Sequence, residues 1–95
     1  MVKSITTEEI LTLIQEECGE LVQACAKAHR FGLSSCHPET KPTTNIETII
    51  RECIDVCAVI DMLIRDMDPK MFEDLKQVKI DKVLLWHKKK GKMKK

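Results

Sequence analysis

Aromatic side chains are almost absent from this chain of 95 residues, which contains two phenylalanines, one tryptophan and no tyrosine. Aliphatic, methionine and alanine side chains must therefore fill any core. Because charged residues make up 33% of the sequence, beside many Leu, Ile, Val and Ala, the composition favours helices over sheets. The length allows one domain. So short a domain buries a modest fraction of its surface, which makes association with a second copy a natural way to complete the core.

Long apolar runs are also missing. The longest uninterrupted run, residues 56–60, is far too short to span a bilayer, and the N-terminus lacks the apolar region of a signal peptide. No C-x-x-C pair occurs among the five cysteines. Cys53 and Cys57 have the spacing of half a zinc site, but no second pair accompanies them. The sequence therefore indicates reduced core thiols in a cytoplasmic protein.

The formal net charge of +1 conceals an uneven distribution. Six of the 16 basic residues lie in residues 88–95, which leaves ten against 15 acidic residues in residues 1–87. We therefore expect one acidic domain over residues 1–87, followed by a disordered lysine-rich tail over residues 88–95. The acidic body argues against a broad nucleic-acid surface, although the tail alone can contact phosphates.

Capping signals divide the domain into predicted helices. Thr6 with Glu9 forms a capping box for a first helix over residues 7–30, and Gly32 follows its end. Apolar side chains recur along this helix at spacings of three and four residues, which predicts one buried face. These side chains are Ile10, Ile14, Cys18, Leu21, Cys25 and Ala28.

A polar, helix-breaking segment, residues 33–43, follows the first helix. Thr44 with Glu47 then forms a second capping box, and a second helix is predicted to continue to about Met67. It carries apolar side chains over a broad arc, so it is expected to have neighbours on more than one side.

Asp68-Pro69 is typical of the start of a helix, and the third predicted helix runs from there to about Lys89. The sequence thus predicts an all-α architecture, in which an antiparallel helical hairpin and a third helix are completed as a four-helix-type bundle by oligomerisation. The expected assembly is a homodimer or homotetramer.

Two pairs of acids distinguish the hairpin, Glu17 with Glu20 and Glu52 with Asp55. A spacing of three residues projects both acids of a pair from one side of the helix, beside its apolar stripe. Glu20 lies ten residues before the predicted end of its helix, and Asp55 lies ten residues after Asn45, so each is about 15 Å from the turn. Four carboxylates at one level need a counter-charge such as Mg²⁺, with Mn²⁺ as a possible substitute. The alternative interpretation is that these acids lie on ordinary solvated edges of the two helices and bind no metal.

The stretches EECGELVQACAKAHRFG and NIETIIRECIDVCAVIDMLI resemble the MazG-like branch of the all-α nucleoside triphosphate pyrophosphohydrolases, and are most like its short phage-type members. That family carries Glu-x-x-Glu on one helix and Glu-x-x-Asp on the next. The resemblance covers residues 13–86, including KIDKVLLW at 79–86, which is similar to the family's lysine-containing closing helix.

The resemblance implies a magnesium-dependent hydrolase that converts (deoxy)nucleoside triphosphates to monophosphate and pyrophosphate. It implies metal binding by Glu17, Glu20, Glu52 and Asp55, and bundles of two or four subunits. Glu17 is the candidate for orienting or deprotonating the attacking water, because a glutamate in a carboxylate cluster can have a raised pKa.

Six further residues are candidates for contacts with the substrate: Lys27, Arg30, Asn45, Lys79, Lys82 and Trp86. Lys27 and Arg30 follow Glu20 on the first helix, where the alternative is an interaction with the helix dipole. The resemblance favours a phosphate role for Lys79 and Lys82, against a plain solvent face.

Trp86 and Asn45 each allow two interpretations. Trp86 either stacks on a base or anchors a core or interface. Asn45 either reaches a nucleotide across a subunit boundary or is a first-turn helix residue. Two other functions also fit the pattern, a phosphoribosyl-ATP pyrophosphatase and a non-catalytic helical interaction module with a basic tail, but the paired acids favour the enzyme.

Overall fold

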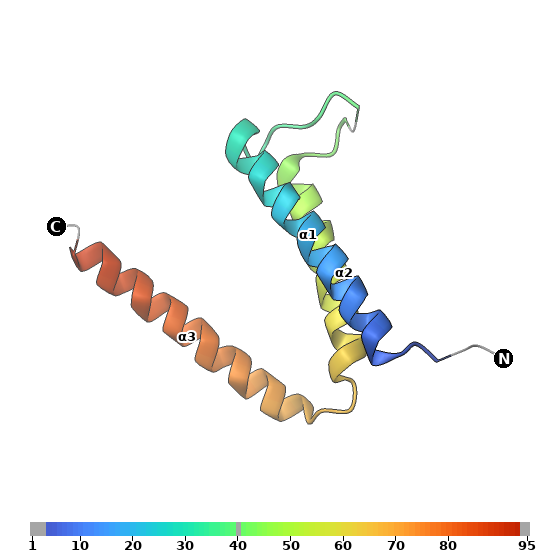
Figure 1. Ribbon diagram of the computed structural model, residues 1–95. Coiled ribbons are helices and arrows are strands. Elements are labelled where there is room, and N and C mark those ends of the chain that lie inside the picture. The colour runs from blue at the N-terminus through green and yellow to red at the C-terminus, as the bar shows by residue number, and fades with distance from the viewer. Residues whose placement is uncertain (1–3, 40, 94–95) are drawn as a thin grey trace. The chain divides into compact units, whose positions relative to one another are not determined.

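The computed structural model describes residues 4–39 and 41–93, and every regular element in these ranges is helical. The helices are α1 (Thr7–Phe31), α2 (Asn45–Ile64) and α3 (Pro69–Met93), as Figure 1 shows. The predicted all-α class is confirmed. The chain divides into two compact units, residues 1–65 and 66–95. The first unit is the hairpin of α1 and α2, and the second contains α3.

Helix α1 begins and ends at the residues that local chemistry selects. The Thr6 hydroxyl accepts a hydrogen bond from the Glu9 amide at 3.1 Å, which satisfies one of the free donors of the first turn. At the other end Gly32 has a φ of +98°, and its amide donates to the Ala28 carbonyl at 2.8 Å. A residue without Cβ reverses the chain there at low cost. The helix ends one residue later than predicted.

Helix α2 starts as predicted but is shorter. The Thr44 hydroxyl accepts from the Glu47 amide at 3.3 Å, whereas the helix ends at Ile64 rather than near Met67. Proline disfavours helical geometry in the residue before it, so the chain must leave the path of α2 by Asp68. No single residue marks the earlier end at Ile64.

Helix α3 begins where Asp68-Pro69 predicts. The Asp68 side chain accepts from the Lys70 amide at 3.0 Å. The helix continues to Met93, beyond the predicted end at Lys89. Residues 88–93, which the sequence assigned to a disordered tail, are therefore helical, and residues 94–95 lie outside the described part. Lysine is a good helix former, and cations near a helix C-terminus are favourable.

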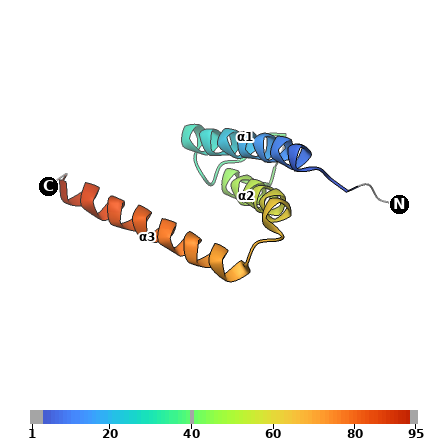
Figure 2. The ribbon, with the colours of Figure 1, turned by 60° about the horizontal axis from the view of Figure 1, so that its bottom comes forward.

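The hairpin packs α1 along α2, and Figures 1 and 2 show the two helices side by side. Among the described residues, the buried side chains are Ile10, Ala24, Ala28 and Val59. This core is small, and its alanines are compatible with a close approach of the two backbones. Large apolar side chains elsewhere on the hairpin therefore remain exposed.

The cysteines depart from the predicted core position. All five are free, but Cys18, Cys53 and Cys57 are exposed. Within residues 4–39 and 41–93, no helix is long and apolar enough to cross a membrane.

Candidate metal centre

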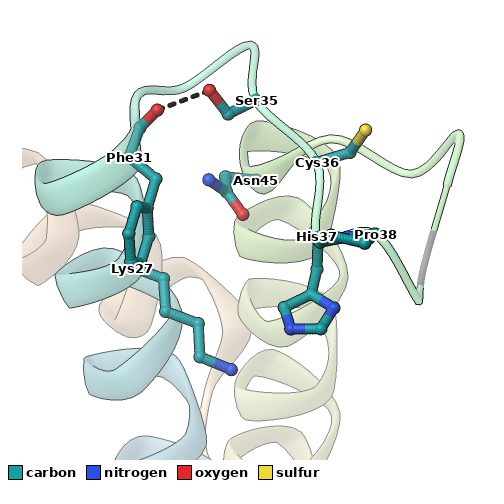
Figure 3. A pocket seen from close by; sticks show the side chains of 7 residues that line it. All are labelled: Lys27, Phe31, Ser35, Cys36, His37, Pro38 and Asn45. Atoms are coloured by element: carbon teal, nitrogen blue, oxygen red, sulfur yellow. Dashed lines mark hydrogen bonds between the residues drawn. The ribbon is translucent and has the colours of Figure 1, made fainter.

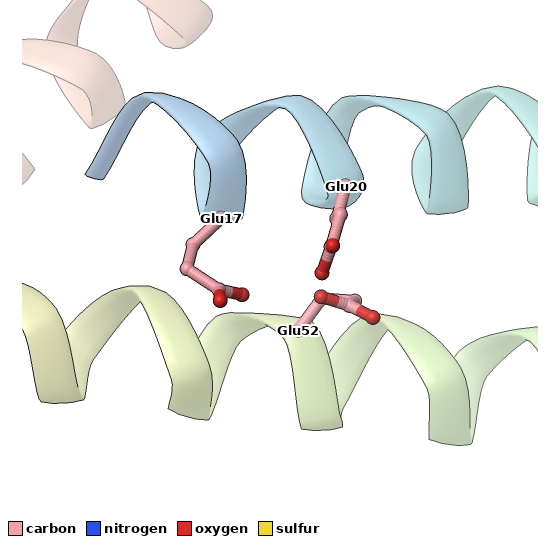
Figure 4. A group of neighbouring side chains, drawn as sticks. All are labelled: Glu17, Glu20 and Glu52. Atoms are coloured by element: carbon pink, nitrogen blue, oxygen red, sulfur yellow. The ribbon is translucent and has the colours of Figure 1, made fainter. Parts of the chain in front are cut away.

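Three of the four predicted metal ligands meet in the middle of the hairpin. One carboxylate oxygen from each of Glu17, Glu20 and Glu52 lies within 4.8 Å of the other two. Figure 4 shows Glu17 and Glu20 reaching from α1 toward Glu52 on α2. The antiparallel pairing thus brings acids from both helices to one level, as the distances to the turn predicted. Their binding of a metal stays a prediction.

Glu17 and Glu52 do not merely flank the apolar stripes, as the sequence suggested. Each lies on the face that its helix turns toward the other helix, and each is half-buried. On α1, Glu17 follows Ile10 by seven residues and precedes Ala24 by seven, which places all three on one line of the helix surface. An acid on this line is held between the helices, whereas Glu20 is exposed at the edge.

The environment of these two carboxylates opposes their ionisation. Loss of solvation raises the pKa of Glu17, and the charges of Glu20, Asp55 and Glu52 raise it further. Loss of solvation also raises the pKa of Glu52, followed by the charge of Glu20, a hydrogen bond with Glu20 and the charge of Asp55. Only a protonated carboxyl can donate that hydrogen bond. With all the acids ionised, the cluster has excess negative charge and no donor of its own.

One oxygen on each inward glutamate lacks a partner. The Oε2 atoms of Glu17 and Glu52 are shielded from solvent, and neither has a hydrogen-bond partner among the described residues. An unpartnered buried carboxylate oxygen is costly. A hard cation with oxygen ligands would satisfy both atoms and the excess charge.

Asp55 is nearby but outside the tight group. Its charge contributes to the raised pKa of both Glu17 and Glu52, yet its carboxylate is not among the oxygens that lie within 4.8 Å of one another. Asp55 is also exposed. The arrangement is therefore three close carboxylates with a fourth at the rim.

Lys27 and Asn45 lie together at the loop end of the hairpin. Both line a pocket of about 640 Å³, which Figure 3 shows from close by. None of the four acids lines it. The carboxylate cluster and the pocket are thus separate places on the hairpin.

The other predicted substrate residues are Arg30 on α1 and three residues of α3. The Arg30 guanidinium carbon is 5.3 Å from the centre of the Phe31 ring. Lys79, Lys82 and Trp86 are exposed on α3, in the second unit. The Lys90 ammonium is 5.1 Å from the centre of the Trp86 ring, so the indole carries a cation on one face.

The sequence did not identify five residues that line the pocket: Phe31, Ser35, Cys36, His37 and Pro38. The length and the prolines of the segment after the first helix were the only available signal. Comparison with family models, with curated proteins and with solved structures finds no significant match for this chain. The assignment of a function therefore depends on the residues and their geometry.

Proposed function

We propose that the protein is a MazG-like, magnesium-dependent pyrophosphohydrolase that converts (deoxy)nucleoside triphosphates to monophosphate and pyrophosphate. The observation that carries the proposal is the group of three carboxylates from two helices, two of which present shielded oxygens without a partner. Such a group raises the free energy of the metal-free protein. A function that requires a bound divalent cation accounts for its presence.

The donor set fits magnesium. All four acids offer oxygen ligands, and the exposed edge at Glu20 and Asp55 leaves room for water and phosphate oxygens, which Mg²⁺ usually retains among its ligands. Glu17, Glu20, Glu52 and Asp55 would hold the ion. When bound, Mg²⁺ or Mn²⁺ neutralises negative charge on the phosphates and on the leaving group.

Glu17 is the proposed base. Its raised pKa brings it closer to the range in which a carboxylate accepts a proton from water effectively. In this scheme Glu17 orients a water and takes its proton as the water oxygen bonds to the α-phosphorus. The bond from that phosphorus to the bridging oxygen breaks, and pyrophosphate leaves with the bonding pair. Lys27, two turns beyond Glu20 on α1, would face the phosphate chain.

Assembly belongs to the same proposal. Ile50 and Ile54 are 52% and 61% exposed and are one turn apart on α2. Exposed apolar side chains in line along a helix favour a second helix over them. We therefore propose a homodimer or homotetramer of a cytoplasmic protein, with α2 of one subunit against α2 of another.

Pyrophosphate release tests the activity. Release is measured with nucleoside triphosphates, deoxynucleoside triphosphates and phosphoribosyl-ATP. We expect it from the nucleoside or deoxynucleoside triphosphates, and only when Mg²⁺ or Mn²⁺ is present. Glu20→Gln and Asp55→Asn should each lower kcat on the order of 10²- to 10³-fold, with helicity unchanged by circular dichroism. Glu16→Gln is the matched control, because Glu16 is an exposed acid on the same helix outside the cluster.

The rivals give different results in the same experiment. Hydrolysis of phosphoribosyl-ATP alone would favour the related pyrophosphatase. No release from any nucleotide, together with nucleic-acid binding that is lost on deletion of residues 88–95, would favour the interaction module. Full activity of both acid variants would remove the metal centre.

A further inference from the structure

The pocket at the loop end of the hairpin is built from three consecutive parts of the chain. Lys27 and Phe31 come from the last turns of α1, Asn45 is the first residue of α2, and the connecting segment supplies the rest: Ser35, Cys36, His37 and Pro38. Figure 3 shows these side chains around one space, with Phe31 on one side and His37 on the other. A concave, largely apolar space with a few polar groups is the usual form of a small-molecule site.

Hydrogen bonds fix the frame of this pocket. The backbone N–H of Asn45 donates to the Ser35 carbonyl at 2.7 Å, and the backbone N–H of Ile46 donates to the Leu33 carbonyl at 2.9 Å. The Ser35 hydroxyl donates to the Phe31 carbonyl. Residues 33–35 of the connecting segment are therefore tied to both helices, which fixes this side of the pocket.

The same network orients the Asn45 side chain. Its Nδ2 donates to the Gly32 carbonyl at 2.9 Å, which turns Oδ1 the other way. In Figure 3 this oxygen points into the space between Lys27 and His37. The pocket thus presents a fixed hydrogen-bond acceptor beside the flat Phe31 ring, which is 62% exposed.

We infer that this pocket binds the base of the nucleotide, an inference that rests on the proposed function. A nucleobase has a flat apolar face for the Phe31 ring and an N–H edge for Asn45 Oδ1. Lys27 lies seven residues beyond Glu20, about 10 Å along α1 and on nearly the same side of the helix. Its ammonium group is therefore placed for the phosphates of a nucleotide whose base is in the pocket and whose phosphate chain runs toward the carboxylates.

Binding of nucleoside monophosphates without metal tests the inference apart from catalysis. AMP, CMP, GMP and UMP are titrated into the full chain in EDTA, and the amide signals are followed by NMR. For at least one of them we expect saturable shifts at Phe31, Ser35, His37 and Asn45. Inorganic phosphate at the same concentrations should not reproduce them. Equal shifts with phosphate, or no shifts at these amides, would overturn the base site.

Variants of the ring sharpen the test. Phe31→Ala should weaken binding about tenfold or more, because stacking on an aromatic side chain contributes that much. Phe31→Leu keeps an apolar side chain and removes only the flat ring, so it should behave similarly and also guards against misfolding of the alanine variant. Leu33→Ala is the matched control, since Leu33 is exposed nearby and does not line this pocket. Unchanged affinity in both Phe31 variants would contradict the inference.

Hydrolysis distinguishes the two proposals. If the wild type releases pyrophosphate and Phe31→Ala raises KM with little change in kcat, both stand. If hydrolysis occurs but the monophosphates leave the pocket amides unchanged, the base site is wrong and the enzyme remains. If no nucleotide is hydrolysed while a monophosphate still shifts the pocket amides, the activity is wrong and the pocket remains a nucleotide-binding site.

Discussion

Glu17 and Glu52 both oppose folding of the metal-free protein, whereas the proposed function requires both of them. Each occupies a place on the helix–helix contact where an apolar side chain would pack, and each has a raised pKa because of lost solvation and neighbouring acids. A group whose pKa is higher in the folded than in the unfolded state binds more protons when folded. Its ionisation therefore opposes folding, and the opposition grows with pH.

The first prediction concerns this pH dependence. In EDTA, the contribution of these two glutamates to the free energy of unfolding should be most favourable below their ordinary pKa of 4.5. It should decline as the pH rises through their raised values. Glu52→Gln removes one of the ionisations, so it should raise the melting temperature at pH 7 and flatten the decline.

Thermal unfolding in EDTA between pH 4 and pH 8 measures this effect. Glu16→Gln is the control, because Glu16 is exposed outside the cluster and its replacement should leave the pH profile unchanged. A melting temperature for Glu52→Gln below that of the wild type at pH 7 would show that the cluster is not under strain.

The helices themselves were largely predictable because their limits depend on residues close in sequence. Thr6, Thr44 and Asp68 cap their helices through side-chain bonds to amides two or three residues later. The end of α2 and the extent of α3 were less accurate, because no single residue marks either end. The pocket was not predictable. It depends on bonds between Gly32, Ser35 and Asn45, and no local pattern specifies such pairings.

The second prediction concerns two glycines, Gly19 within α1 and Gly32 directly after its last residue. Gly32 has a φ of +98°, and a Cβ there would also lie 3.4 Å from the Ser35 hydroxyl. Gly32→Ala should therefore cost about 1–3 kcal/mol. Gly19 lies within the helix, and nothing is within 4 Å of a Cβ there, so Gly19→Ala should stabilise the chain by about 0.5–1 kcal/mol.

Chemical unfolding of the two variants gives the signs directly. Gly19→Ala should raise the denaturant concentration at the midpoint of unfolding, and Gly32→Ala should lower it. Destabilisation by Gly19→Ala in a dimer but not in a dilute monomer would show that a second subunit approaches the helix at this point. Equal effects at both positions would contradict the conformational role of Gly32.

On the scale of the whole molecule, the exposed apolar side chains of α2 lead to the third prediction. The wild type should be a dimer or tetramer by light scattering at micromolar concentration. Ile50→Lys should shift it toward the monomer and lower its melting temperature. In a true monomer, a change at a side chain that is 52% exposed would alter stability by only about 0.5 kcal/mol or less.

Val22→Lys provides the control for this experiment. Val22 is 68% exposed, and it lies on α1 rather than on the proposed contact between α2 helices. Its replacement should leave the assembly intact. A well-folded wild-type monomer with full activity would exclude the proposed association.

The two inward glutamates also determine what a laboratory selection would recover from this chain. A library screened for heat resistance in a chelating medium would enrich neutral residues at positions 17 and 52. Each such replacement removes a charge repulsion that no bound cation offsets in the metal-free hairpin. Under the proposed function, these survivors would be inactive, so robustness would be gained at the expense of turnover. The same library screened with magnesium in the medium should rank the acidic parent above them.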